Sequence, residues 1–192
     1  MTTYENRIVR IVILILAIIV LVLLYTSIDS ASTLASVKYK KAEKELRAIR
    51  DREHALQAQG FRLHMALMLL DCPKQKIQIV IKSITDSVQS ASNKYPIDPI
   101  LVAVLMKTES EFLPTARSSK GYKGILQTPW ASMEFYNVDT LYGVMILEQK
   151  LVVSRGKLRT ALALYKGGRS RQAYKQADEV LRLLKKVRTQ VP

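Results

Sequence analysis

One segment near the middle of the chain is bounded so tightly that only a helix fits it. Asp98 can cap a helix N-terminus with its side chain, and Pro99 then takes the first helical position, where a missing N–H costs nothing. Pro114 forces the helix to end upstream, near Phe112. The pattern therefore predicts a helix over residues 98–112.

A glutamate lies at the centre of the apolar arc of this helix. At about 100° per residue, Glu109 falls among positions that face the interior, whereas Glu111 falls on the opposite side, near Lys107. Burial disfavours the ionised carboxylate, so we expect Glu109 to keep its proton near neutral pH, as a general acid requires. The alternative is a buried carboxylate that only bonds a neighbouring backbone amide. The apolar positions of the arc are Leu101, Val102, Leu105, Met106 and Phe112.

The rest of the chain also favours helices. No run of alternating apolar and polar residues is long enough for a convincing strand, and residues 118–128 are too polar and glycine-rich to bury one. The predicted fold class is therefore mainly α. The predicted helices cover residues 8–36, 38–70, 76–92, 98–112, 130–136, 139–154, 157–165 and 170–188.

The N-terminal segment predicts a transmembrane helix. Residues 8–24 are apolar apart from Arg10, and these 17 residues span about 25 Å as a helix, at the short end of what crosses a bilayer. Arg10 can reach the interface, and Tyr25 stands where an interfacial aromatic residue belongs. A cleaved signal peptide with a small-residue site at 33–35 is the alternative. We expect an uncleaved anchor.

Residues 38–70 predict a long helix with a heptad seam. Its inward positions follow alternating steps of three and four residues, and Glu53 and Gly60 interrupt the apolar stripe. A coiled-coil dimer is one interpretation, but the breaks favour a helix that packs on its own domain or a hairpin that bends at Gly60. The predicted organisation is a transmembrane anchor with its flanks (1–36), a helical stalk or packing helix (37–75), and a catalytic-sized domain (76–192).

Positive charge accumulates toward the C-terminus of a chain whose net charge is +14. From Lys150 onward, 12 basic residues stand against only Asp178 and Glu179. Such a field attracts anionic polymers, among them peptidoglycan, teichoic acid, lipid headgroups and nucleic acid. A solvated surface that keeps the protein soluble explains the same charges equally well.

Metal and disulfide chemistry have little support in the sequence. Cys72 is the only cysteine, so no intramolecular disulfide can form. His54 and His64 lie ten residues apart, with no cysteine or carboxylate at a recognised ligand spacing. We expect no metal and no cofactor.

Small and polar residues follow the predicted helix of residues 98–112. Ser118, Gly121 and Gly124 form a flexible stretch where a backbone can approach a polymer closely. Gln127 ends this stretch, where its amide would contact a substrate or hold the loop, with neither favoured.

With Glu109-Ser110, this stretch resembles the catalytic domain of the soluble lytic transglycosylases, a lysozyme-like family that cleaves peptidoglycan. The resemblance covers residues 76–188, and Leu113 and Lys166 stand where the family has asparagine. The other matching segments are residues 95–99, 112–114, 164–168 and 174–181.

The resemblance implies a lysozyme-like helical domain and a catalytic role for Glu109. Glu109 would protonate the oxygen between N-acetylmuramic acid and N-acetylglucosamine, and then assist attack by the C6 hydroxyl, giving a 1,6-anhydro product. A single carboxylate suits this reaction, whereas the usual hydrolytic mechanisms need two. Tyr165 would orient Glu109, and Lys166 would lower the pKa of Glu109 if its ammonium reached the carboxylate. The implied substrate-binding residues are Ser118, Gly121, Gly124, Gln127, Tyr165 and Lys166.

The function predicted from the sequence is a membrane-anchored lytic transglycosylase that opens the cell wall locally for a secretion machine, a pilus or an incoming phage genome. Its partners would be peptidoglycan glycan strands and, through residues 8–24, the membrane. The alternatives are a weakened lysozyme-like domain that binds glycan or scaffolds an assembly, and a membrane protein that binds nucleic acid through its basic C-terminal region.

The predicted location is the inner membrane, with a single span and a periplasmic catalytic domain. A virion-associated membrane protein is the alternative. The positive-inside rule argues for the opposite orientation, because Lys38, Lys40, Lys41 and Lys44 follow the span. We favour the outward orientation because a wall-degrading domain must face the wall.

Overall fold

A computed structural model describes residues 3–90, 95–132 and 135–192. Within residues 3–36 it describes the side chains only of residues 16, 18–23 and 25. The described chain is mainly α, as the sequence predicts, and it contains no strand. Two isolated bridges join Lys123 to Arg117 and to Thr128 in the loop after the third helix.

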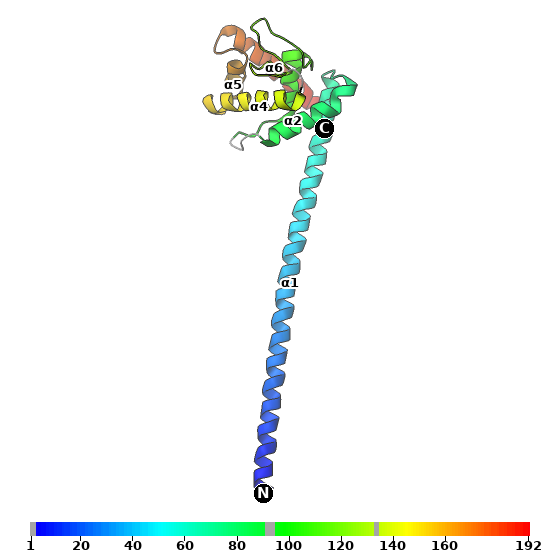
Figure 1. The fold of residues 1–192 in the computed structure, drawn as a ribbon, viewed down its shortest axis with the longest axis vertical. Helices are drawn as coiled ribbons and strands as arrows, with labels where there is room; N and C mark the ends of the chain where they lie inside the picture. The colour runs from blue at the N-terminus through cyan, green and yellow to red at the C-terminus, as the bar shows by residue number, and fades with distance from the viewer. Residues whose placement is uncertain (1–2, 91–94, 133–134) are drawn as a thin grey trace. The chain divides into compact units, whose positions relative to one another are not determined.

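Six α-helices and one short 3-10 helix make up the described structure (Figure 1). Most lie within a few residues of the predicted helices, and side-chain caps at Asp98 and Ser170 fix the starts of two of them. The helices are α1 (Thr3–Leu69), η1 (Lys74–Lys76), α2 (Ile77–Ser90), α3 (Pro99–Ser110), α4 (Tyr136–Val153), α5 (Leu158–Tyr165) and α6 (Arg171–Gln190).

Helix α1 merges the two helices predicted over residues 8–36 and 38–70. It continues through Gly60 without interruption, so the predicted hairpin at that residue is wrong. A single glycine costs a helix only about 1 kcal/mol, which a helix of 67 residues can absorb. The other favoured interpretation, a helix that packs on its own domain, is confirmed for the last turns of α1, where Leu63, Leu67 and Leu70 are buried in the core.

The predicted membrane anchor at residues 8–24 lies within α1, where most side chains fall outside the described residues. Among the described residues, no helix combines the length and apolar character that a bilayer crossing requires. The anchor stays a prediction.

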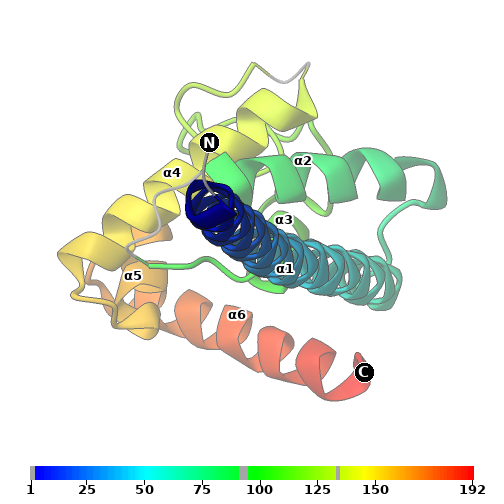
Figure 2. The same cartoon turned by 90° about the horizontal axis from the view of Figure 1, so that it is seen from below.

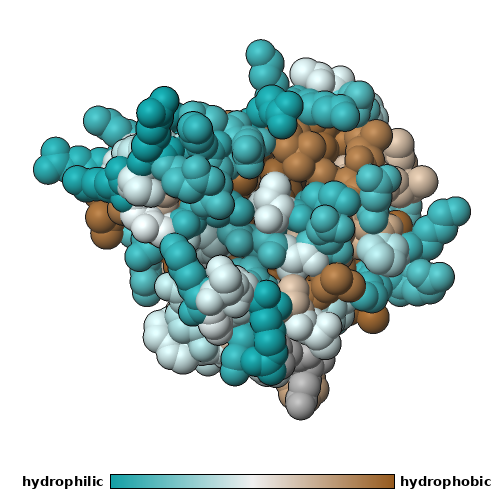
Figure 3. All heavy atoms as spheres, turned by 90° about the horizontal axis from the view of Figure 1, so that it is seen from above, coloured by the Kyte–Doolittle hydropathy of each residue, from teal (hydrophilic) through white to brown (hydrophobic). Residues whose placement is uncertain are grey.

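The chain forms two compact units, residues 1–55 and residues 56–192. In the described part of the first unit, the apolar side chains of α1 are exposed. The second unit holds the hydrophobic core, to which the last turns of α1 contribute Leu63, Leu67 and Leu70. The surface seen in Figure 3 is mostly hydrophilic, as expected from the many lysines and arginines of the chain.

The helix predicted over residues 130–136 is wrong at residues 130–132 and 135, and residues 133 and 134 lie outside the described residues. Residues 130–132 form a turn and irregular chain, and α4 begins only at Tyr136. The carboxylate of Asp139 accepts hydrogen bonds from the backbone N–H of Ser132, at 2.6 Å, and from its hydroxyl, at 3.1 Å. These bonds hold the segment in a non-helical conformation.

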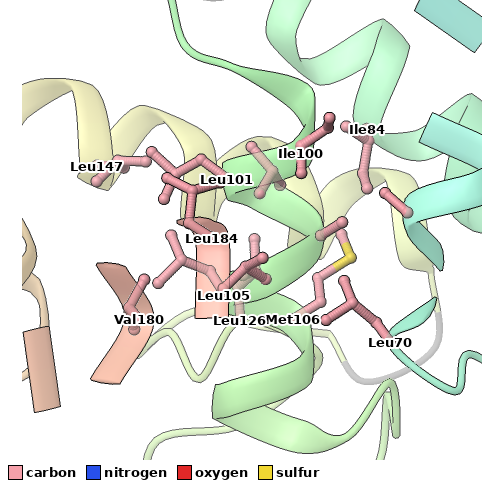
Figure 4. Close-up of a cluster of buried hydrophobic side chains, with 14 of the residues drawn as sticks. Leu70, Ile84, Ile100, Leu101, Leu105, Met106, Leu126, Leu147, Val180 and Leu184 are labelled. Atoms are coloured by element: carbon pink, nitrogen blue, oxygen red, sulfur yellow. The ribbon is translucent and has the colours of Figure 1, made fainter. Parts of the chain in front are cut away.

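Helix α3 lies in the middle of the second unit, with α2, α4, α5 and α6 around it (Figure 2). Its residues 100–106 are all buried, so this helix is apolar on every side rather than along one arc. Helix α6 packs on both α3 and α5, and α4 packs on α2 and α5. Figure 4 shows Leu101, Leu105 and Met106 among side chains from the surrounding elements. Burying each such side chain contributes about 1.5–3 kcal/mol.

Both ends of α3 are fixed by local chemistry. Asp98 accepts a hydrogen bond from the backbone N–H of Ile100 at 2.9 Å, as predicted for the N-cap, and Arg188 of α6 donates to the other oxygen of its carboxylate. The helix ends at Ser110, two residues before the predicted end, because Glu111 adopts a left-handed conformation with φ 51°. The carboxylate of Glu109 is therefore carried on the last turn of a helix that cannot shift without disturbing the core.

Candidate active site

A groove of about 690 Å³ opens beside the C-terminal end of α3. Its walls come from the end of α3, the loop over residues 118–130, α4, the end of α5 and the start of α6. Among the residues that line it are five of the predicted site residues: Glu109, Ser118, Gln127, Tyr165 and Lys166. Gly121 and Gly124 are not among the lining residues. The structure thus brings together side chains that are up to 57 positions apart in the sequence.

Glu109 is largely shielded from solvent and is paired with a lysine. Its side chain is 14% exposed, and its Oε1 lies 2.9 Å from Nζ of Lys166, whose side chain is 8% exposed. Lys166 also donates to the hydroxyl of Thr108 at 3.3 Å. The ammonium therefore reaches the carboxylate, the condition under which the sequence predicts that Lys166 lowers the pKa of Glu109.

Two opposing influences set the proton affinity of Glu109. Burial of the carboxyl raises the pKa of Glu109 above its usual value, and the charge and hydrogen bond of Lys166 oppose that rise. Burial is the larger influence, so the pKa of Glu109 stays raised. The raised pKa predicted from the sequence is confirmed in direction. A raised pKa keeps more of the carboxyl protonated at a given pH, as proton donation requires.

Tyr165 lies at the end of α5 and joins this helix to the loop. Its hydroxyl donates to the backbone carbonyl of Leu126 at 2.8 Å. Burial, and then the nearby charge of Glu109, raise the pKa of Tyr165 well above its usual value, so the phenol keeps its proton. The one hydroxyl proton of Tyr165 is therefore donated to the loop and not to Glu109. Tyr165 nevertheless lies close enough to Glu109 for the two groups to interact electrostatically.

Gln127 holds the loop from within. Its side-chain nitrogen donates to the backbone carbonyls of Gly124, at 2.8 Å, and Ala116, at 3.1 Å, so both amide protons are used by the protein. Its buried Oε1 has no hydrogen-bond partner among the described residues. Of the two uses that the sequence left open, the loop hydrogen bond is the one observed.

Ser118 and Ser110 also fasten this loop. The hydroxyl of Ser118 accepts a hydrogen bond from the backbone N–H of Tyr122 at 3.0 Å, which closes a tight turn at the rim of the groove. The hydroxyl of Ser110 lies 2.8 Å from the carbonyl oxygen of Ile125 and ties the loop to the end of α3. The serine after Glu109 therefore holds the loop against the end of the helix that carries the carboxylate.

The two loop glycines serve different ends. Gly121 has φ +83°, and a Cβ atom added there would meet no atom within 4 Å. Gly124 has φ +78°, and an added Cβ would lie 2.5 Å from the Cβ of Ala131 and 2.7 Å from Oδ2 of Asp139. At Gly124, close packing inside the protein requires the glycine, where the sequence had suggested an approach to the polymer.

Sequence reasoning missed several side chains of the groove. Trp130, 68% exposed, and Tyr122, 42% exposed, give it aromatic surface, and Lys120 and Lys150 give it positive charge. Trp130 is the only tryptophan of the chain and stands in a polar, glycine-rich segment, a signal that could have identified it. The lysines carry no such signal, because surface lysines are common throughout the chain.

The described residues contain no group of three or more histidines, cysteines, aspartates or glutamates that could hold a metal ion. Cys72 is a buried free thiol, and burial raises its pKa. The groove itself is lined by a carboxylate, lysines, hydroxyls and amides, with aromatic surface beside them.

Comparison with known families agrees with this geometry. The model of the transglycosylase SLT domain matches residues 86–180, which include α3, the loop, α4, α5 and the first half of α6. No solved structure matches the chain significantly. The chain belongs to the transglycosylase SLT family, a lysozyme-like family of lytic transglycosylases that act on peptidoglycan glycan.

The contacts of Gly124 generate a stability prediction. Gly124→Ala should lower the free energy of unfolding by about 2–4 kcal/mol, because the new methyl group meets Ala131 and Asp139 and the positive φ adds strain. Gly121→Ala, which meets only open space, should cost about 1–2 kcal/mol from its positive φ alone. Urea unfolding of both variants measures the difference. Equal losses would mean that the packing around Gly124 is not as described.

Proposed function

We propose that this protein is a lytic transglycosylase that cleaves the β-1,4 bond between N-acetylmuramic acid and N-acetylglucosamine without water. The observation that carries the proposal is the shielded carboxyl of Glu109 in a groove of about 690 Å³. Among the residues lining this groove, Glu109 is the only aspartate or glutamate. A site with one carboxylate suits a reaction in which one group acts first as acid and then as base.

The proposed reaction uses Glu109 twice. Its proton passes to the glycosidic oxygen as the bond to C1 of N-acetylmuramic acid breaks, and N-acetylglucosamine leaves as the alcohol. The resulting carboxylate then takes the proton of the C6 hydroxyl of the same N-acetylmuramic acid, whose oxygen bonds to C1. Glu109 ends protonated, the product carries a 1,6-anhydro ring, and no water is consumed. Proton transfer of this kind contributes about 10²–10⁴ in rate.

Lys166 would act differently in the two halves of this cycle. In the resting enzyme, the ammonium at 2.9 Å lowers the fraction of Glu109 that carries the proton needed for the acid step. Once the proton has left, the same ammonium stabilises the carboxylate. Lys166 therefore stabilises the stage of the reaction in which Glu109 is ionised, but it reduces the protonated fraction of Glu109 in the resting enzyme. The second effect restricts activity to a lower pH range.

The remaining predicted residues shape the groove. We propose that Ser118 and Gln127 position the loop that contacts the glycan, and that Tyr165 keeps this loop against the end of α5 beside Glu109. Trp130 offers an exposed aromatic face of the kind on which sugar rings stack.

A second candidate is a domain that binds glycan without cutting it. The observation in its favour is the ion pair between Glu109 and Lys166, both largely shielded, since a shielded ion pair resists neutralisation of either partner. Such a domain would retain affinity for sacculi and release nothing.

Location and assembly are part of the proposal. We propose that residues 8–24 tether the protein to the inner membrane, with the groove on the wall side, and that it opens the wall for an envelope or virion assembly. Alkaline extraction of membranes from cells that make the full chain tests the tether: a protein released into the supernatant would contradict it.

Muropeptide analysis tests the reaction itself. The protein should release 1,6-anhydro-muropeptides from purified sacculi, and Glu109→Gln should lower the rate about 100-fold or more because the amide cannot donate the proton. Glu111→Gln, at the exposed neighbouring glutamate, is the matched control and should keep full activity. Products with reducing ends in place of anhydro rings would contradict the mechanism. Binding of sacculi without release by the unaltered protein would favour the second candidate.

The position of Lys166 generates a pH prediction. Lys166→Asn removes the charge that lowers the pKa of Glu109, so this pKa should rise. Activity falls as pH rises through the pKa of the acid, so the alkaline limb of the rate profile should move to higher pH. Lys185→Asn, at an exposed position outside the groove, is the control. An unchanged limb in Lys166→Asn would mean that Lys166 does not influence the acid.

The other two lysines of the groove generate a binding prediction. Glu109 pairs with Lys166, so Lys120 and Lys150 leave the groove positively charged toward a glycan whose peptide stems carry carboxylates. Lys120→Gln with Lys150→Gln should weaken binding to sacculi about tenfold at low salt and flatten its salt dependence. Lys185→Gln with Lys186→Gln, on α6 away from the groove, is the matched pair. Equal effects of both pairs would assign the attraction to the whole basic surface.

A further inference from the structure

The first unit presents an uncovered apolar stripe on α1. Tyr39, Leu46 and Ile49 are 72%, 64% and 63% exposed, and Leu56 just beyond the unit boundary is 45% exposed. Together with Ala42 and Glu53 they follow alternating steps of three and four residues, which place them on one face of a helix. Side chains of this size on a regular seven-residue repeat are typical of a helix with a helical partner.

The same repeat is covered further along α1. Its later positions include Leu63, Leu67 and Leu70, which are at most 2% exposed because the second unit packs on them. The repeat thus divides into a covered part and an uncovered part.

The charged residues on either side of the apolar stripe indicate which kind of helical partner could cover it. In heptad terms Tyr39 and Leu46 are a positions and Ala42, Ile49 and Leu56 are d positions, so Lys38 and Glu45 are g positions and Glu43 and Arg50 are e positions. In a parallel two-stranded coil, each g residue faces the e residue of the next heptad on the other strand.

A second copy of this chain satisfies that geometry. Lys38 would face Glu43 of the second copy, and Glu45 would face Arg50 of the second copy, so both cross-strand pairs join opposite charges. The reciprocal pairs are identical by symmetry. Within one chain, Glu43 already lies 2.6 Å from Arg47, but an exposed pair of this kind contributes little and leaves Glu43 available.

We propose that residues 38–57 of α1 form a parallel, in-register homodimeric coiled coil. The stripe and its charges carry the pairing with a second copy. The parallel direction also agrees with the proposed membrane tether, because both N-termini then point to one bilayer, and to that extent it rests on the proposed function. Each dimer would bring two SLT domains to the same region of the wall.

Glu53 limits the strength of this dimer. It occupies an a position, where it would face Glu53 of the second copy, and a polar residue at such a position costs stability while fixing register. Three heptads are also near the lower limit for a coiled coil. The full chain should therefore exchange between monomer and dimer rather than stay permanently paired.

Disulfide trapping of the full chain in mild detergent tests the pairing and its direction. In a Cys72→Ala background, Ala42→Cys and Leu56→Cys, both at d positions, should each form disulfide-linked homodimers under mild oxidation. Lys44→Cys, at an outward f position, is the control and should not. The proposal would be overturned if Lys44→Cys formed cross-linked dimers as fast as the two d-position variants. It would also be overturned if neither d-position variant formed them. Cross-links between Ala42→Cys and Leu56→Cys proteins mixed together, without homodimers of either, would overturn the parallel direction.

Charge exchange tests the same pairing without cysteines. Glu45→Arg should weaken the dimer severalfold in sedimentation, because it places two like charges together, and adding Arg50→Glu should restore it. Glu53→Leu should tighten the dimer about tenfold or more. Unchanged association in all three proteins would overturn the proposal. The release of anhydro-muropeptides by the same proteins tests the proposed reaction separately. A failure of the dimer proposal can therefore be distinguished from a failure of the proposed function.

Discussion

The structure of the second unit depends on the burial of α3 on all sides. A helix whose residues 100–106 are all buried cannot rotate or slide without opening cavities among tightly packed side chains. The caps at Asp98 and Glu111 fix where this helix begins and ends. Since Glu109 is carried on its last turn, the position of the carboxyl is set by the core, and the groove is built around it by the loop, α4 and the start of α6.

The chemistry of the groove depends on a balance at this carboxyl. Burial favours the protonated form and Lys166 favours the ionised form, and burial is the stronger of the two. A site that uses one carboxyl as acid and then as base needs both forms within reach, and a raised pKa opposed by a nearby ammonium provides this. Lys166 is therefore the group of this chain that tunes the proton affinity of its acid.

The sequence predicted those features of the structure that neighbouring residues determine, such as helix starts and helix faces. The pair Asp98-Pro99 predicted where α3 begins, and the helical periodicity of residues 101–112 predicted that Glu109 faces the interior. Contacts between distant residues were harder to predict. That Gln127 would use its amide protons on Ala116 and Gly124, or that Gly124 would pack against Asp139, depends on how the loop folds back, which no local pattern reveals. Lys120 and Lys150 look like any other surface lysines until the fold brings them to the groove. The single tryptophan in a glycine-rich segment was a usable signal that was overlooked.

Glu109 should keep its proton to a higher pH than an ordinary glutamate, and a carbon-13 NMR titration of its carboxyl measures the pKa concerned. The pKa of Glu109 should lie above the value of about 4.3 for an unperturbed glutamate. A pKa at or below that value would mean that Lys166 outweighs burial and that the groove holds a carboxylate with no proton to give.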